Sequence, residues 1–248
     1  MSVLDNPVWW ALAGSQRHLG SVSDRVARFD PEVSPFAAAV DAPTDDDWAE
    51  LAGMAGPGGQ LALIEQGEGA ITPGHGWTAV WEASGVQMVW DRADVEIGAR
   101  PLRTVESPTP TPSHPIALGQ DDVGDMLDLV AVARPGPFLA RTVEFGGYLG
   151  VRDAGRLIAM AGERLRPPGF TEISAVATDP GHRRRGLGER LVRAVGAAIV
   201  ERGDIPFLHA ASTNVTAIRL YESMGFVVRR PVAFVVLRAP GGDGGPVG

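Results

Sequence analysis

The second half of the chain alternates between short apolar runs and longer amphipathic stretches. In the stretch 186–202, Leu187, Leu191 and Val195 recur at helical spacing and would share one face of a helix. Runs such as 173–178 are short, apolar and bounded by turn residues, which is typical of strands. The pattern predicts helices at 116–132, 186–202 and 214–224, and strands at 147–151, 157–163, 173–178, 206–211 and 226–237, the last a strand pair or one long strand broken at Pro231. Strands that alternate with helices predict an α/β domain over 116–238.

The first 105 residues have a different character. They hold all six tryptophans of the chain, and we expect them to form a packed unit of their own. Their pattern predicts a helix at 45–54, with acids in its first turn, and short strands at 61–64, 77–81 and 86–90. Four prolines within 107–115 favour an extended linker, predicted at 106–115. The tail, 239–248, has five glycines and two prolines and is predicted to be disordered.

Composition narrows the classes of protein to consider. The 248 residues contain no cysteine, which excludes a disulfide scaffold, a thiolate metal site and a cysteine nucleophile. The five histidines are scattered without ligand spacing, so no metal is expected. No apolar run approaches the roughly 20 residues that span a bilayer, and the N-terminus does not read as a signal peptide. A cytoplasmic protein that does not bind membranes is therefore expected.

The formal charge of −8 is unevenly shared. Residues 1–105 carry a net charge of −9 and residues 106–248 a net charge of +1, and every basic residue is arginine. An acidic molecule without a basic stripe is repelled by nucleic acid at long range, so no nucleic-acid partner is expected. The acidic half could attract a cationic partner or serve solubility alone.

One segment has the features of an anion-binding loop. The predicted strand 173–178 runs into a loop of glycines and arginines, 181–188, which opens the helix that follows. Glycines allow a ligand to approach the backbone, and the free N–H groups of a helix start attract an anion such as a diphosphate. The loop is not a P-loop, because the chain has no lysine, and it lacks the first glycine of the dinucleotide fingerprint.

The segment 183–188, Arg-Arg-Arg-Gly-Leu-Gly, resembles the acetyl-CoA loop Q/R-x-x-G-x-G/A of the GNAT N-acetyltransferases. Downstream, 214–226 resembles the family pattern N-x-x-A-x-x-x-Y-x-x-x-G-F. The resemblance covers about 116–238 and implies the GNAT-like fold, a mixed and mostly antiparallel sheet flanked by helices. The chain looks like a two-part member whose N-terminal half, 1–105, is a degenerate acetyltransferase-like domain.

The resemblance also implies a set of binding residues for acetyl-CoA, the acyl donor. The strand backbone at Val176, Ala177 and Thr178 would pair with the pantetheine arm. Asn214 would bind pantetheine or cap its own helix, and Ala217 and Tyr221 would lie along the same arm. The diphosphate would be held by the loop and the first turn of the helix, that is by Arg183, Arg184, Arg185, Gly186, Leu187, Gly188 and Glu189.

Catalysis would need a proton donor and a base. Tyr221 would protonate the leaving thiolate of CoA, because a phenol can hand its proton to a developing thiolate. A base would help because attack on a thioester requires a neutral amine. Glu172 and His209 are both candidates for that base, and the sequence does not choose between them.

Several points stay open at this stage. The acceptor is an amine of a small molecule or a peptide, with Arg141, Glu144 and Tyr148 among the residues that could recognise it. The alternative to an enzyme is a non-catalytic acyl-CoA sensor or partner subunit that keeps the loop but lacks turnover. A homodimer is possible.

Overall fold

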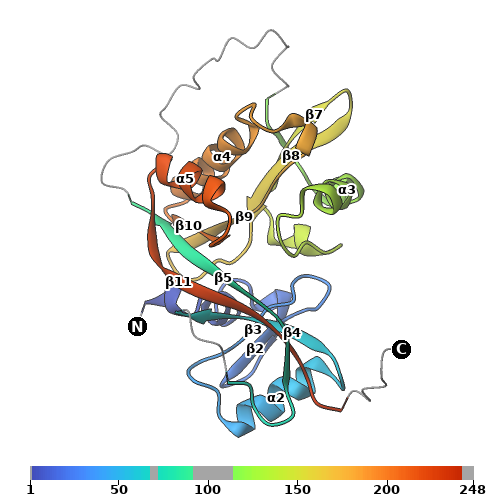
Figure 1. The fold of residues 1–248 in the computed structure, drawn as a ribbon, viewed down its shortest axis with the longest axis vertical. Helices are drawn as coiled ribbons and strands as arrows, with labels where there is room; N and C mark the ends of the chain where they lie inside the picture. The colour runs from blue at the N-terminus through green and yellow to red at the C-terminus, as the bar shows by residue number, and fades with distance from the viewer. Residues whose placement is uncertain (1, 68–71, 92–113, 242–248) are drawn as a thin grey trace.

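The computed structural model describes residues 2–67, 72–91 and 114–241, and its centre is a sheet of eight strands. Only β9 and β10 pair in parallel; every other neighbouring pair is antiparallel (Figure 1). The mixed, mostly antiparallel sheet expected from the sequence is confirmed. In sheet order the strands are β4 (Gln60–Gln66), β11 (Phe226–Arg238), β5 (Thr78–Trp90), β10 (Ile205–Ala211), β9 (Phe170–Thr178), β8 (Arg156–Glu163), β7 (Leu149–Asp153) and β6 (Ile116–Ala117).

Strands from the N-terminal part complete this sheet. β5 lies between β10 and β11, and β4 forms the outer edge beside β11. The hydrogen-bonded sheet is therefore continuous between the two parts of the chain, and the described residues 2–67 and 72–91 do not form a packed unit of their own. The predicted linker falls mostly on 92–113, outside the described residues. That the N-terminal part is a degenerate acetyltransferase-like domain stays a prediction.

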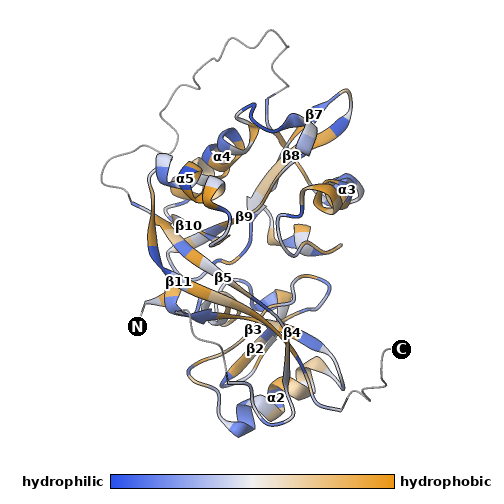
Figure 2. Cartoon of the chain, viewed as in Figure 1, coloured by the Kyte–Doolittle hydropathy of each residue, from blue (hydrophilic) through white to orange (hydrophobic). Residues whose placement is uncertain are grey.

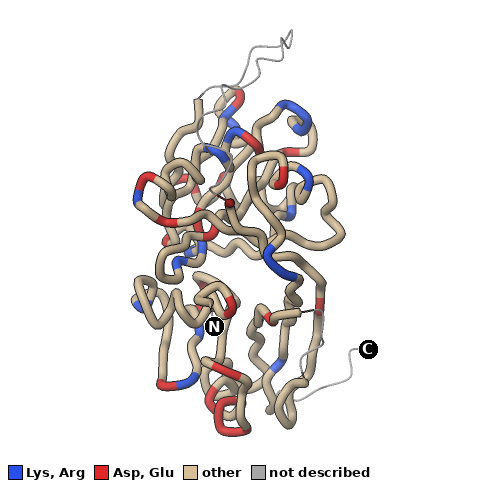
Figure 3. The backbone as a smooth tube through the Cα atoms, turned by 90° about the vertical axis from the view of Figure 1, so that its left-hand side faces the viewer, with Lys and Arg blue, Asp and Glu red and all other residues tan. Residues whose placement is uncertain are grey.

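The rest of the N-terminal part surrounds the end of the sheet that holds β4. A small antiparallel sheet consists of β1 (Gly20–Val22), β2 (Val26–Phe29) and β3 (Ala37–Ala39). Helix α1 (Pro7–Leu12) precedes it and α2 (Asp45–Ala55) follows it. Figure 3 shows acidic residues gathered at the end of the molecule that holds α2, whose first turn contains three aspartates.

Three helices flank the C-terminal half of the sheet. They are α3 (Val123–Ala133), α4 (Leu187–Glu201) and α5 (Val215–Ser223). Neighbouring residues of β8 face opposite sides: Met160 belongs to the same buried cluster as Met126 of α3, and Ala161 to the same cluster as Leu191 of α4. Alternate residues of a strand point to opposite faces, so α3 and α4 cover the two faces of the sheet (Figures 1 and 2). Short 3-10 turns lie at Val3–Asp5, Arg17–Leu19, Gln120–Asp122, Thr142–Phe145 and Pro180–His182.

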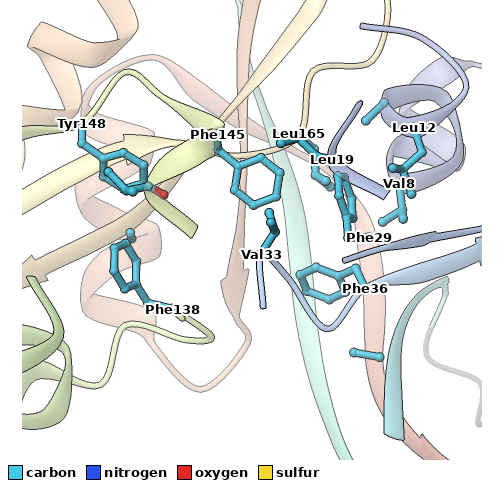
Figure 4. Packing of buried hydrophobic residues seen from close by; sticks show 14 of the residues in the cluster. Val8, Leu12, Leu19, Phe29, Val33, Phe36, Phe138, Phe145, Tyr148 and Leu165 are labelled. Atoms are coloured by element: carbon cyan, nitrogen blue, oxygen red, sulfur yellow. The ribbon is translucent and has the colours of Figure 1, made fainter. Parts of the chain in front are cut away.

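The largest buried cluster joins the two parts of the chain. Phe29 of β2 packs edge-to-face on Phe145, with ring centroids 5.2 Å apart, and Val8 and Leu12 of α1 lie in the same cluster (Figure 4). Fully burying a side chain of this size is worth about 1.5–3 kcal/mol. The cluster therefore binds the N-terminal elements firmly to the C-terminal half.

Several predicted elements differ in detail. The helix expected at 116–132 starts only at Val123, because Ile116 and Ala117 pair with β7 as an edge strand. The strands expected at 77–81 and 86–90 are one strand, β5, and the final strand β11 runs unbroken through Pro231 with a register shift two residues earlier. Of the predicted disordered tail, Ala239 is buried and its N–H donates to Gly59 O, whereas 242–248 lies outside the described residues.

Candidate active site

The strands β9 and β10 pair at one end and part at the other. Their register contains only three pairs, of which the last joins Phe207 and Glu172, although β9 continues to Thr178 and β10 to Ala211. A cleft of about 570 Å³ opens where they part, lined by 173–178 of β9 and 209–211 of β10. The predicted residues Val176, Ala177 and Thr178 therefore lie in the wall of the cleft.

A bulge in β9 shapes this wall. Ala175 has a φ of +51°, and the register with β8 shifts between Met160 and Gly162. Alanine in the left-handed region costs about 1–2 kcal/mol. Bulges occur frequently beside active sites, where they redirect the strand and its side chains.

The start of α4 has the properties of an anion site. Gly186, the N-cap, has a φ of +74°, and no described side chain caps the helix. The exposed side chains of Arg183, Arg184 and Arg185 precede it. A Cβ built on Gly188 would lie 3.8 Å from Thr178 Oγ1, so this first turn faces the end of β9. Uncapped N–H groups, a helix dipole and adjacent guanidinium groups fit an anion such as a diphosphate.

The cleft does not extend over the whole predicted loop. Of the residues 183–189, only Arg183 lines it, and its Nε donates to Thr178 O over 3.4 Å. Leu187 is buried in the sheet-facing side of α4, and Glu189 pairs with Arg193 one turn on. The anion site is thus adjacent to the cleft, at its α4 end.

Helix α5 forms a second wall of the cleft. Asn214 caps the helix, its Oδ1 accepting from the N–H of Ala217 at 3.2 Å, which is one of its two predicted roles. Asn214, Ala217 and Tyr221 all line the cleft, as their spacing on one helical face allows.

Tyr221 faces the cleft with its phenol protonated. Its side chain is almost wholly buried, and none of the described residues hydrogen-bonds to its hydroxyl. Burial raises the pKa of Tyr221 to about 12. The hydroxyl therefore carries a proton at neutral pH and has no competing partner in the protein.

Glu172 lies beneath the cleft, and both of its carboxylate oxygens are engaged. Arg164 holds it with two hydrogen bonds, Nε to Oε2 at 2.8 Å and Nη2 to Oε1 at 2.6 Å. His209 Nδ1 lies 2.7 Å from Oε1. Burial alone would raise the pKa of Glu172, but the guanidinium of Arg164 and the contact with His209 more than offset it and lower the pKa to about 2.

His209 is bonded on both ring nitrogens. Its Nε2 lies 3.2 Å from Nε2 of Gln87, a buried residue of β5. The amide of Gln87 has a fixed orientation, because Arg229 can only donate and its Nη1 bonds Oε1 at 2.8 Å. The Gln87 amide N–H must then donate to His209 Nε2, which places the ring proton on Nδ1, toward Glu172.

Two members of this network, Arg164 and Gln87, were not predicted from the sequence as partners of Glu172 and His209. The signal for Gln87 was a single polar residue in the otherwise apolar run 86–90. Arg164 directly follows the predicted strand 157–163, and nothing in the sequence marks it as the partner of Glu172. The predicted acceptor residues lie elsewhere: Arg141 pairs with Glu144 and Asp30, and Tyr148 is buried against Phe138.

The described parts of the chain contain neither a cluster of metal-ligating side chains nor a helix suited to a membrane. Within 2–67, 72–91 and 114–241, no group of three or more His, Asp or Glu side chains is placed to hold a metal ion. None of the helices in those same segments has the length and apolar character needed to cross a bilayer.

Comparisons with known proteins agree with the geometry. The FR47-like protein family matches residues 148–235, which include the cleft-lining parts of β9, β10 and α5. The N-alpha-acetyltransferase RimI of Mycobacterium tuberculosis is 37% identical over 82 residues, which are 32% of this chain and 51% of that protein. The mycothiol acetyltransferase of Acidimicrobium ferrooxidans is 36% identical over 100 residues, or 38% of this chain and 32% of that protein. The chain thus spans about half or less of these curated relatives.

Solved structures extend the similarity to the whole chain. A protein from Novosphingobium aromaticivorans assigned to the GNAT family of acetyltransferases is 38% identical, with a TM-score of 0.79, over 96% of this chain and 98% of that one. A GCN5-related N-acetyltransferase from Kribbella flavida shares the fold with a TM-score of 0.58 at 17% identity, covering 95% of this chain and 96% of that one.

Proposed function

The chain belongs to the GNAT family of acetyltransferases, and we propose that it transfers an acetyl group from acetyl-CoA directly to an amine bound in the cleft between β9 and β10. The observation that carries this proposal is the meeting of three features at one cleft. These are the edge of β9 that no longer pairs with β10, the uncapped start of α4 beside three arginines, and the protonated hydroxyl of Tyr221. An anion site, an extended binding wall and a proton donor are together what a thioester donor needs.

The residues predicted for acetyl-CoA fit this arrangement. The first turn of α4, 186–189, and the side chains of 183–185 would hold the diphosphate. Val176, Ala177 and Thr178 would bind the pantetheine arm through their backbone, opposite Asn214 and Ala217. Bound there, acetyl-CoA supplies an acetyl group activated as a thioester.

Tyr221 serves as the general acid in this proposal. The amine nitrogen forms a bond to the acetyl carbon, the carbon–sulfur bond breaks, and Tyr221 gives its proton to the departing sulfur. The proton that the amine loses passes to solvent, from which Tyr221 is reprotonated. Because the two substrates are held together in one cleft, positioning supplies much of the acceleration.

Glu172 and His209 act as positioning residues rather than as the base. Both oxygens of Glu172 and both ring nitrogens of His209 are bonded within the protein, so neither offers a free lone pair to an amine. With the pKa of Glu172 lowered to about 2 by Arg164 and His209 against the effect of burial, its carboxylate is also a weak base. Their network instead fixes the floor of the cleft.

An acceptor-dependent assay of free thiol tests the proposal. Incubating the purified protein with acetyl-CoA and a pool of amines should release CoA thiol in proportion to the amine added. The chain contains no cysteine, so a thiol reagent reports CoA alone. Binding of acetyl-CoA without thiol release on any amine would favour the alternative, a non-catalytic acyl-CoA sensor or partner subunit. A homodimer and a cytoplasmic location stay predictions.

A further inference from the structure

Much of the cleft wall consists of apolar groups from both parts of the chain. Trp81 and Ala83 of β5 face it together with Phe234 and Val236 of β11, their partners across the strands. Phe36, from the N-terminal part, packs under the guanidinium of Arg164 at 4.9 Å. Trp81 keeps 56% of its surface exposed, which is unusual for an indole and leaves it free to cover a ligand.

The charged side chains at this cleft are all arginines. Arg134, Arg164 and Arg183 line it, and no Asp or Glu is among its lining residues in the described chain. Glu82 lies between Trp81 and Ala83 in β5 and so points to the opposite face of the strand. A polycationic amine would therefore find no carboxylate partner here, only positive charge and apolar walls.

We infer that the acceptor is a hydrophobic α-amino acid: an amine that carries an apolar side chain and a carboxylate. This inference rests on the proposed acetyl transfer and names its substrate class. Apolar walls and neighbouring positive charge both disfavour an ammonium ion, so the cleft itself promotes the neutral amine that attacks a thioester. The α-amine of an amino acid has a lower pKa in solution than a lysine-like amine, whose pKa is about 10.4, and is therefore easier to deprotonate.

Arg134 is the residue placed to bind the carboxylate. It ends α3 in a left-handed conformation, with a φ of +51°, directly before Pro135. A left-handed backbone is unusual at the end of a helix for any residue other than glycine or asparagine. The proline that follows further restricts the backbone of Arg134. The side chain is exposed and lines the cleft, and no described residue forms an ion pair with it. Arg164 is already neutralised by Glu172, and Arg183 lies at the α4 end of the cleft, where the diphosphate would bind. Arg134 is therefore the guanidinium left for a bidentate bond to a carboxylate.

A matched set of amines tests the substrate class through thiol release. L-Phenylalanine and L-leucine should be acetylated with a kcat/KM about 10- to 100-fold above that of 2-phenylethylamine, which lacks the carboxylate, because a charge-assisted hydrogen bond is worth about that factor. Spermidine should be the poorest acceptor. If spermidine is acetylated at least as well as phenylalanine, the inferred substrate class is wrong, although the acetyl transfer is supported. If the protein binds acetyl-CoA but releases no thiol with any of these amines, the proposed acetyl transfer itself is contradicted.

Arg134→Gln tests the assigned contact. The variant should raise KM for L-phenylalanine about 10- to 100-fold with kcat little changed, and should reduce the preference over 2-phenylethylamine to a few-fold. Binding of the product N-acetyl-L-phenylalanine, measured by calorimetry with CoA present, should weaken in parallel. Arg238→Gln, an exposed arginine at the far end of β11, is the matched control and should change neither value. An unaltered preference in Arg134→Gln would remove Arg134 from the site.

Discussion

Tyr221→Phe should lower kcat about 10²- to 10⁴-fold while leaving acetyl-CoA affinity within a few-fold of the parent protein. The substitution removes only the hydroxyl and keeps the ring, which packs edge-to-face on Phe226 with centroids 6.1 Å apart. The general acid is lost, and such groups typically contribute this factor to a rate. Because burial raises the pKa of Tyr221 to about 12, the parent protein should keep its proton donor across the neutral and mildly alkaline range.

The second tyrosine of the chain is the control for this prediction. Tyr148 is as deeply buried, but it lies outside the cleft and its hydroxyl donates to Thr142 O over 3.4 Å. Tyr148→Phe should therefore leave kcat unchanged. Steady-state rates of thiol release for both variants decide the matter, and undiminished turnover in Tyr221→Phe would exclude it as the proton donor.

Glu172→Gln should destabilise the fold by about 3–5 kcal/mol. Removing one member of a buried ion pair leaves the other as an uncompensated charge, here Arg164, whose side chain is only 11% exposed. Denaturant unfolding of the parent and the variant measures the difference. Combining Glu172→Gln with Arg164→Met removes the stranded charge and should restore part of the loss.

A surface pair of the same geometry is the control for burial. Arg141 donates two hydrogen bonds to Glu144, of 2.6 Å and 2.9 Å, but both side chains are about one-third exposed. Glu144→Gln should therefore cost about 1 kcal/mol or less. An equal loss in Glu144→Gln and Glu172→Gln would contradict the role assigned to burial.

The loss in Glu172→Gln should also depend on pH. Arg164 and His209 outweigh burial and lower the pKa of Glu172 from 4.5 to about 2, so its carboxylate contributes stability that is complete above about pH 4.5. That contribution disappears as the pH falls through 2, where the folded protein takes up the proton. The difference between parent and variant should accordingly be constant at neutral pH and shrink between about pH 4.5 and 2.

Local patterns sufficed to predict most of the helices and strands. The amphipathic spacing in α4 and the cap at Asn214 are encoded within a few residues, and both were found. The insertion of β5 between β10 and β11 was not, because its register joins residues as distant as Gln87 and His209. Pairing between strands so far apart in the sequence depends on which strand edges are still unpaired when the chain has collapsed. No local sequence pattern contains that information.

The site was predictable in its motifs but not in its connections. The loop at Arg183 and the position of Tyr221 follow from short segments that resemble a family. That Glu172 and His209 bond each other, with Arg164 and Gln87 saturating them, depends on four elements meeting in space. The acidic charge of the N-terminal part likewise gave no hint that its contribution to the cleft is apolar, through Phe36 and Trp81.

Calorimetric titration with acetyl-CoA tests the central claim, that the start of α4 binds the diphosphate beside the cleft. Gly186→Asp puts a negative charge in the anion site, and Gly203→Asp puts one at the other end of α4; both glycines have a positive φ and open space around a built Cβ. We expect measurable binding by the parent protein and by Gly203→Asp, and a loss of at least about 10-fold in affinity for Gly186→Asp. Equal affinity in all three proteins, or no binding by the parent, would contradict it.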